Sequence, residues 1–132
     1  MRILLDTNFI VSCVKQKIDL FNFEDVNWIV PLNVIEELKK ISTTKDKTIK
    51  DRRAALVSLE IIDSLKDKKI EFPILKIENV DSAIIDFCKK NPEVILATLD
   101  KKIKSKTKND NLTIRGRKFL KVEAKNEIRR AL

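Results

Sequence analysis

Short apolar runs alternate with amphipathic segments along most of this chain of 132 residues. We expect strands at residues 2–6, 28–30, 70–75 and 94–99, each followed by a helical pattern, and Pro73 favours an edge position for the third. Strands that are joined through helices pair in parallel, because each crossover helix returns the chain to the same edge of the sheet. The pattern therefore predicts an α/β fold, namely a three-layer α/β/α sandwich with a central, mainly parallel sheet.

The middle of the chain carries a polar connection followed by a long helical pattern. Residues 42–50 are polar and charged, which predicts a mobile loop. Residues 51–66 have helical periodicity, and we expect Leu56, Leu59 and Ile62 to point toward the core. We found no Gly/Ser-rich linker and no internal repeat, so we expect residues 1–132 to form a single domain.

The positive charge is concentrated in the C-terminal quarter. The chain has a formal net charge of +8, and residues 101–132 contain 12 of its 28 Lys and Arg but 3 of its 20 acids. A basic segment beside a near-neutral body is typical of a protein that binds a polyanion such as RNA, although a lysine-rich surface can also be merely solvated. Residues 112–114 and 119–122 predict a last strand, and residues 123–132 a short helix.

Three residue types that carry much enzyme chemistry are scarce. Without histidine, the chain has no Ser-His-Asp triad and no His-ligated zinc. Gly116 is the sole glycine, so neither a P-loop nor a dinucleotide-binding glycine motif is present. Two cysteines, Cys13 and Cys88, are too few for a four-cysteine zinc site, and their apolar neighbours predict reduced core thiols. A hydrolase of this composition would depend mainly on carboxylates that hold Mg²⁺ or Mn²⁺.

No segment has the pattern of a signal peptide or of a membrane span. The first apolar run ends at Asp6, and no stretch approaches the roughly 18 apolar residues that a span requires. We therefore expect a cytoplasmic protein that has no membrane partner.

Four acids follow predicted strands: Asp6, Glu37, Asp81 and Asp100. The carboxyl ends of parallel strands lie at one edge of a sheet, which is where such folds bind ligands. Clustered carboxylates supply the oxygens and the negative charge that a hard cation needs, and the cation can activate water for attack on a phosphodiester. On the predicted helix, Glu36 points away from the apolar stripe, whereas Glu37 lies on its flank, so we expect Glu37 in the site.

Helix capping is the alternative explanation for three of these acids. Asp6, Asp81 and Asp100 each precede a predicted helix, and Asp is a preferred N-cap residue. Capping does not explain Glu37.

The four acids, in this order, resemble the PIN domain, a family of Mg²⁺/Mn²⁺-dependent nucleases. The similar segments are Ile3-Leu4-Leu5-Asp6-Thr7-Asn8, the run from Val30 to Leu38 with its acid at Glu37, the run from Asp81 to Ile85, and Ala97-Thr98-Leu99-Asp100. The resemblance implies endoribonuclease activity, with Asp6, Glu37, Asp81 and Asp100 as metal ligands and catalytic residues. It also implies that Asn8 and Thr98 support the site through hydrogen bonds.

The resemblance leaves more than one biological role open. Many small PIN proteins are VapC-type toxins that pair with an antitoxin and are often dimeric, and others mature ribosomal or transfer RNA. A non-catalytic RNA-binding module and an aspartyl-phosphate enzyme that uses Asp6 are alternatives from other classes. For the leading hypothesis, a metal-dependent endoribonuclease, the residues expected to hold the RNA backbone are Lys101, Lys102, Lys104, Arg115, Arg117 and Lys118.

Overall fold

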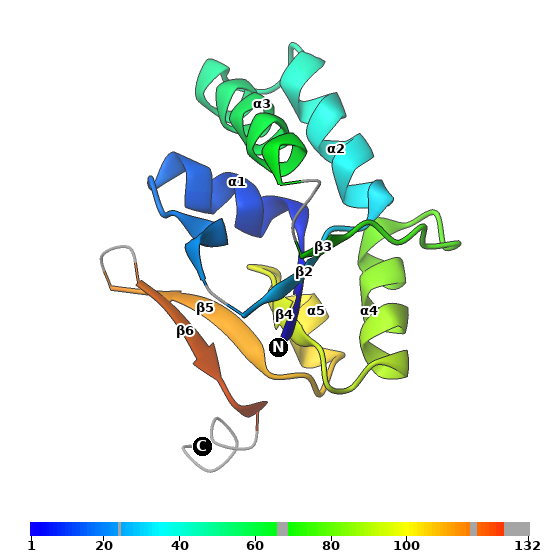
Figure 1. The fold of residues 1–132 in the computed structure, drawn as a ribbon. Coiled ribbons are helices and arrows are strands. Elements are labelled where there is room, and N and C mark those ends of the chain that lie inside the picture. Colours follow the sequence, from blue (N-terminus) through cyan, green and yellow to red (C-terminus); the bar gives the residue numbers. More distant parts are fainter. Residues whose placement is uncertain (24, 66–68, 117–118, 126–132) are drawn as a thin grey trace.

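A computed structural model of the chain describes residues 1–23, 25–65, 69–116 and 119–125 (Figure 1). The strands are β1 (Arg2–Leu5), β2 (Asn27–Ile29), β3 (Ile70–Glu71), β4 (Ile95–Ala97), β5 (Asn111–Arg115) and β6 (Phe119–Glu123). The helices are α1 (Thr7–Lys15), α2 (Leu32–Thr43), α3 (Ile49–Ser64), α4 (Val80–Lys90) and α5 (Lys101–Ser105), with a short 3₁₀ helix at Leu20–Asn22.

The six strands form one sheet in the order β3-β2-β1-β4-β5-β6. The first five pair in parallel, and β6 pairs antiparallel with β5. From β1 the chain first builds the sheet outward through β2 and β3, and then returns to the other side of β1 to place β4. Strand order therefore reverses between β1 and β4, which makes their carboxyl ends a topological switch point.

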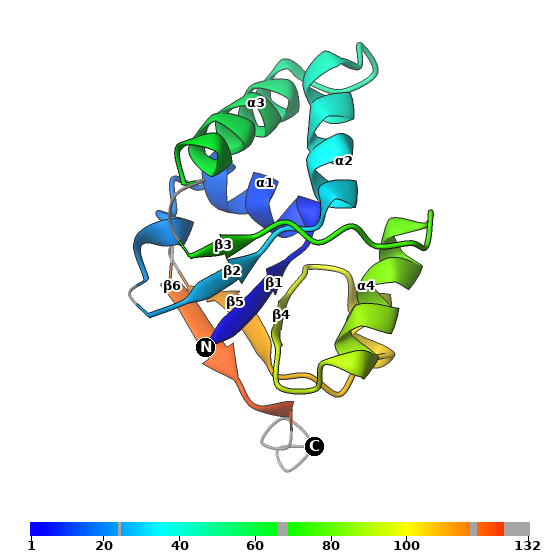
Figure 2. The same ribbon diagram turned by 45° about the vertical axis from the view of Figure 1, so that its right-hand side comes forward.

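Helices cover both faces of the sheet, which confirms the predicted α/β/α architecture (Figure 2). Successive strand residues point to opposite faces. In β1, Ile3 and Leu5 join the core under α1, α2 and α3, whereas Leu4 joins the core under α4 and α5. In β4, Ile95 and Ala97 face the first side and Leu96 the second. Both faces are apolar because both faces are covered.

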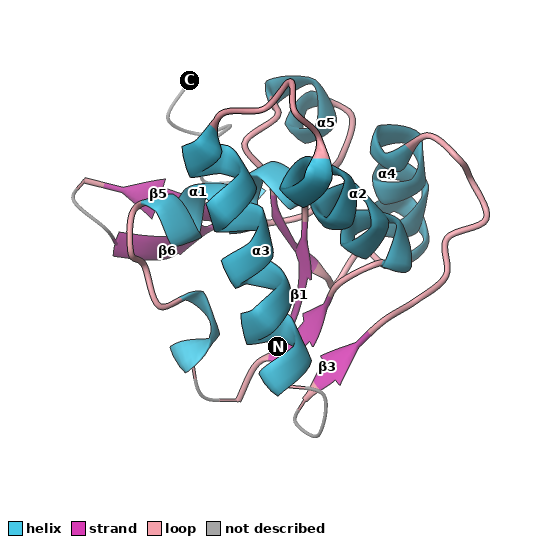
Figure 3. Ribbon diagram, turned by 90° about the horizontal axis from the view of Figure 1, so that it is seen from above, coloured by secondary structure: helices cyan, strands magenta, loops and turns pink. Residues whose placement is uncertain are grey.

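Helix α3 buries part of the stripe that the sequence predicts, since Ile62 is buried and Leu59 packs against the core. The prediction that Leu56 points into the core was wrong, because its side chain is 51% exposed, and Ala54, Ala55 and Ser58 are buried instead. Figure 3 shows α3 lying beside α1 and α2. Small residues permit such a close approach between helices, and a helical pattern that weights only large apolar residues misses them. Residues 42–50, predicted as a loop, lie partly in α2 and α3.

The C-terminal segment forms a hairpin, where the sequence predicted a single strand. Strands β5 and β6 extend to the left of the sheet in Figure 1. Gly116 follows β5 with a φ of +52°, in the left-handed region that glycine adopts without a Cβ clash. Glu123 ends β6, so the predicted helix over residues 123–132 does not begin there, and residues 126–132 lie outside the described part of the chain.

Both cysteines are free and buried, as the sequence predicts. Burial raises the pKa of the Cys13 and Cys88 thiols to about 12, so both remain protonated at neutral pH. No helix among the described residues combines the length and the apolar composition needed to cross a bilayer.

Candidate active site

The carboxyl ends of β1 and β4 bring two of the predicted acids together. Asp6 directly follows β1, and its backbone N–H donates to the Ala97 carbonyl across a distance of 3.0 Å, which extends the pairing with β4. Thr98 and Asp100 follow β4 immediately. Both acids therefore lie at the switch point, where the fold leaves a crevice beyond its strands.

Thr98 links these two acids through its side chain. The Thr98 hydroxyl donates to Asp6 Oδ2 over 2.6 Å, and its oxygen accepts from the backbone N–H of Asp100 over 3.1 Å. Thr98 is fully buried and Asp6 is nearly so. A short O–H···O⁻ bond at a buried carboxylate is a strong hydrogen bond, so Thr98 fixes the orientation of Asp6. This contact agrees with the supporting role predicted for Thr98.

Two helices supply the other predicted acids. Glu37 lies on α2 and Asp81 in the first turn of α4. A pocket of about 360 Å³ is lined by all four acids, together with Asn8, Asn79 and Val80. Exposed Glu36 lines a different pocket, beside Ile74 and Leu75. The structure therefore brings all four acids to one pocket, with Glu37 there and Glu36 elsewhere, as the helical periodicity predicts.

Capping accounts for part of this arrangement. Asp6 accepts from the Thr7 backbone N–H at the start of α1, and Asp100 Oδ1 accepts from the N–H groups of Lys102 and Ile103 at the start of α5. Asp81 is not a cap, because Asn79 caps α4 by accepting from the Ser82 N–H over 3.0 Å. Capping thus leaves Glu37 and Asp81 without a structural reason to face the pocket.

Repulsion between the acids of the pocket contributes to the raised pKa values of Asp6 and Glu37. Burial raises the pKa of Asp6, the Asp81 and Asp100 charges raise it further, and hydrogen bonds from Thr98 and Thr7 oppose the rise. Burial also raises the pKa of Glu37, and the Asp6 and Asp81 charges add to this effect. Asp6 and Glu37 are therefore costly to keep ionised in this pocket unless a cation accompanies them.

The donor chemistry of the pocket fits a hard divalent cation. All four acidic side chains of the pocket offer carboxylate oxygens, the type that Mg²⁺ and Mn²⁺ prefer. Across the described residues, no three His, Cys, Asp or Glu side chains already lie close enough together to hold one ion. An ion held by fewer of these carboxylates would complete its coordination with water.

The predicted RNA-binding residues are distributed unevenly around the pocket. Lys101 and Lys102 begin α5 directly after Asp100, and Lys104 is one turn further on. Arg115 lies in the hairpin, where it pairs with Glu123. Arg117 and Lys118 lie outside the described residues. Of the six residues, Lys101 and Lys102 thus lie closest in sequence to a carboxylate of the pocket.

A comparison with known protein families shows the family to which this chain is related. A sequence model described as "PIN like domain" matches residues 3–117, which include all four acids. The chain belongs to this family.

Two relatives of this PIN-like domain extend over nearly the whole chain. It is 27% identical over 131 residues to "Ribonuclease VapC4" of Methanocaldococcus jannaschii, and the match covers 92% of this chain and 95% of the relative. The solved structure titled "Structure of the PIN domain endonuclease Utp24" superposes with a TM-score of 0.70 and 25% identity, covering 92% of this chain and 90% of that one. The chain is therefore similar to PIN nucleases in both sequence and structure.

The sequence patterns did not point to some of the residues in and beside this PIN-domain pocket. Asn79 caps α4, although the sequence directs attention to Asp81 as a possible cap. Lys15, Lys47 and Lys50 line a second pocket that shares Asn8 with the carboxylate pocket. They lie on α1 and near the α2–α3 connection, far in sequence from the basic tail, so counting charge along the chain could not find them.

Proposed function

We propose that this PIN-like domain is a metal-dependent endoribonuclease that hydrolyses RNA phosphodiester bonds. The observation that carries the proposal is the convergence of four carboxylates, from four separate parts of the chain, on one pocket at the switch point of the sheet. The similarity to a protein named as a ribonuclease and to one named as an endonuclease supports the same activity. We further propose that residues 1–132 act as a single domain.

Asp6, Glu37, Asp81 and Asp100 would hold one or two Mg²⁺ or Mn²⁺ ions. When bound, such a cation supplies positive charge that activates water and stabilises the charge developing on the phosphate. The chain's own contribution is positioning. Thr98 and the Thr7 N–H fix Asp6, and the start of α5 fixes Asp100 through Oδ1. The substrate is a polyanion that the carboxylates alone would repel, so the cation also permits the phosphate to approach.

Cation binding is expected to stabilise the protein as well as activate it. Mn²⁺ at ten times its dissociation constant should raise the free energy of unfolding by about 1.4 kcal/mol, because it binds the folded state. Thermal unfolding with Mn²⁺, Mg²⁺ or EDTA measures this effect, and cleavage of a labelled RNA under the same conditions measures activity. The metal-dependent mechanism is wrong if EDTA leaves cleavage unchanged.

A toxin role is the more specific form of the proposal. The relative named Ribonuclease VapC4 matches this chain over nearly the full length of both proteins, which supports a VapC-like role over one in rRNA or tRNA maturation. Such a role implies an antitoxin partner and favours a homodimer. Induced expression of the wild-type chain in a bacterial host should then arrest growth, whereas Asp6→Asn at the same protein level should not. Equal growth of the two strains would contradict the toxin role while leaving the nuclease proposal to its biochemical test.

A further inference from the structure

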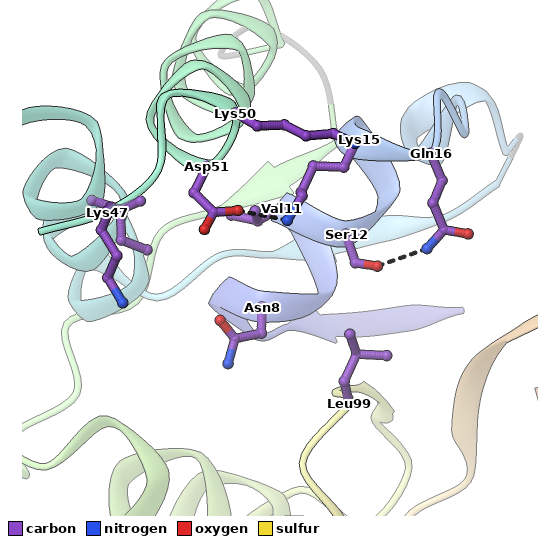
Figure 4. Close-up of a pocket in the computed structure, with 10 residues that line it drawn as sticks. Asn8, Val11, Ser12, Lys15, Gln16, Lys47, Lys50, Asp51 and Leu99 are labelled. Carbon is purple, nitrogen blue, oxygen red and sulfur yellow. Dashed lines mark hydrogen bonds and ion pairs between the residues drawn. The ribbon is translucent and has the colours of Figure 1, made fainter.

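A second pocket adjoins the carboxylate pocket between α1 and the beginning of α3 (Figure 4). We call it the α1–α3 pocket. It has a volume of about 550 Å³, and Asn8 lines both pockets. Leu99 also lines it, and the next residue, Asp100, lines the carboxylate pocket. The two pockets are therefore neighbours, and a chain-like ligand that occupied both would pass Asn8 and Leu99.

The charge of the α1–α3 pocket is opposite to that of its neighbour. Its lining includes Lys15, Lys47 and Lys50 and a single acid, Asp51. Lys15 Nζ lies 2.5 Å from Asp51 Oδ1, so these two charges neutralise each other. In the part of the chain that the structure describes, Lys47 and Lys50 make no ion pair. Lys47 also acts electrostatically on Asp51, so the lining carries three lysine charges against one acid, a net positive charge directly beside a site of four carboxylates.

The walls of the α1–α3 pocket combine apolar and hydrogen-bonding groups. Val11 and Ile41 contribute apolar surface, and Leu99 is 43% exposed although it follows a fully buried strand. Ser12 accepts from the Gln16 amide over 2.8 Å at the same wall. A nucleotide offers the matching chemistry, with a phosphate for lysines, an apolar base and sugar face, and polar edges.

From this arrangement we propose that the α1–α3 pocket binds the RNA nucleotide next to the phosphate that is cleaved. Lys47 and Lys50 each hold one phosphate of the strand at that nucleotide, and its sugar and base pack against Leu99. The Lys15–Asp51 pair joins α1 to α3 and limits the positive charge of the pocket. The proposal rests on the proposed ribonuclease function and adds a substrate-binding site outside the basic tail.

The test measures binding of a short, fluorescein-labelled, single-stranded RNA in EDTA, with Asp6→Asn as the common background so that no RNA is cleaved. Each phosphate contact to a single strand contributes about 0.7 to the slope of log affinity against log salt. The double variant Lys47→Gln/Lys50→Gln should lower that slope by about 1.4. Its RNA affinity relative to that of the parent should therefore fall by a further factor of about seven when KCl is lowered from about 200 to about 50 mM. Asp51→Asn should have the opposite effect and strengthen binding, because it frees the charge of Lys15.

The matched control is Lys89→Gln/Lys108→Gln. Both lysines are exposed: Lys89 lies in the last turn of α4, at the end opposite to Asp81, and Lys108 lies between α5 and β5, and neither lines either pocket. Equal binding loss in the control and in Lys47→Gln/Lys50→Gln would overturn the subsite, and so would weaker binding by Asp51→Asn. Cleavage by the otherwise wild-type chain in Mn²⁺ is assayed separately. Absence of cleavage contradicts the proposed function, whereas cleavage without a specific effect of Lys47 and Lys50 contradicts only the subsite.

Discussion

Asp6→Asn is expected to reduce RNA cleavage by at least about 1000-fold while making the metal-free protein more stable. The loss of activity follows from the position of Asp6, which is the most buried of the four acids and lies beside β4 at the centre of the site. Asparagine keeps the size of the side chain and one oxygen that can accept from Thr7 N or Thr98. It removes the charge that would hold a cation.

The gain in stability has a defined dependence on pH. Burial and the charges of Asp81 and Asp100 raise the folded-state pKa of Asp6 above its ordinary value of 3.8. A carboxyl with a raised folded-state pKa favours the folded state below the unfolded pKa, and this contribution is lost as the pH rises through the folded pKa. Wild-type protein at neutral pH therefore carries the cost of an ionised, buried Asp6, and Asp6→Asn does not.

Unfolding in urea, with EDTA present, measures this difference at several pH values. Asp6→Asn should be more stable than wild type at pH 7, and the difference should shrink as the pH falls toward 3.8. Added Mn²⁺ should then stabilise wild type but have little effect on Asp6→Asn. Glu36→Gln is the matched control, because Glu36 carries the same type of charge on α2 but lies outside the carboxylate pocket. The site assignment fails if Glu36→Gln and Asp6→Asn lose activity equally.

The sequence predicts the layers and the sheet edge well because both depend on short-range pattern. Strand β4 is apolar at every position and β1 is apolar after Arg2, and this continuous pattern indicates burial on two faces. The connectivity of the strands then places Asp6, after β1, and Asp100, after β4, at the same edge of the sheet. Glu37 was distinguished from Glu36 by helical periodicity, which is also a local property. These features required no knowledge of which helices pack together.

The incorrect predictions depend on contacts between distant segments. Leu56 was expected in the core because it is large and apolar, but the packing of α3 against α1 and α2 selects Ala54 and Ala55. The basic groups of the α1–α3 pocket are Lys15 and, at least 32 positions further along the chain, Lys47 and Lys50. A count of charge along the chain finds the C-terminal segment but cannot find a pocket that tertiary packing assembles.

Thr98→Val should damage both stability and activity, because one hydroxyl serves two groups. Valine has nearly the shape of threonine, so the change removes the donor to Asp6 Oδ2 and the acceptor for Asp100 N–H without leaving a large cavity. Hydrogen bonds to charged groups are worth about 1.5–3 kcal/mol, so we expect a loss of stability of about 2–3 kcal/mol. Asp6 also loses a bond that lowers its pKa.

The effect on cleavage distinguishes a positioning residue from one that only packs. Residues that orient metal ligands typically contribute about 10- to 100-fold, so we expect Thr98→Val to lose activity in that range at saturating Mn²⁺. Thr98→Ser is the matched control, because it keeps the hydroxyl and removes a methyl group at a cost of about 1 kcal/mol. If Thr98 acts through Asp6, the serine variant retains most of the activity and the Mn²⁺ affinity, while the valine variant loses both. Equal losses in the two variants would mean that Thr98 contributes through packing alone.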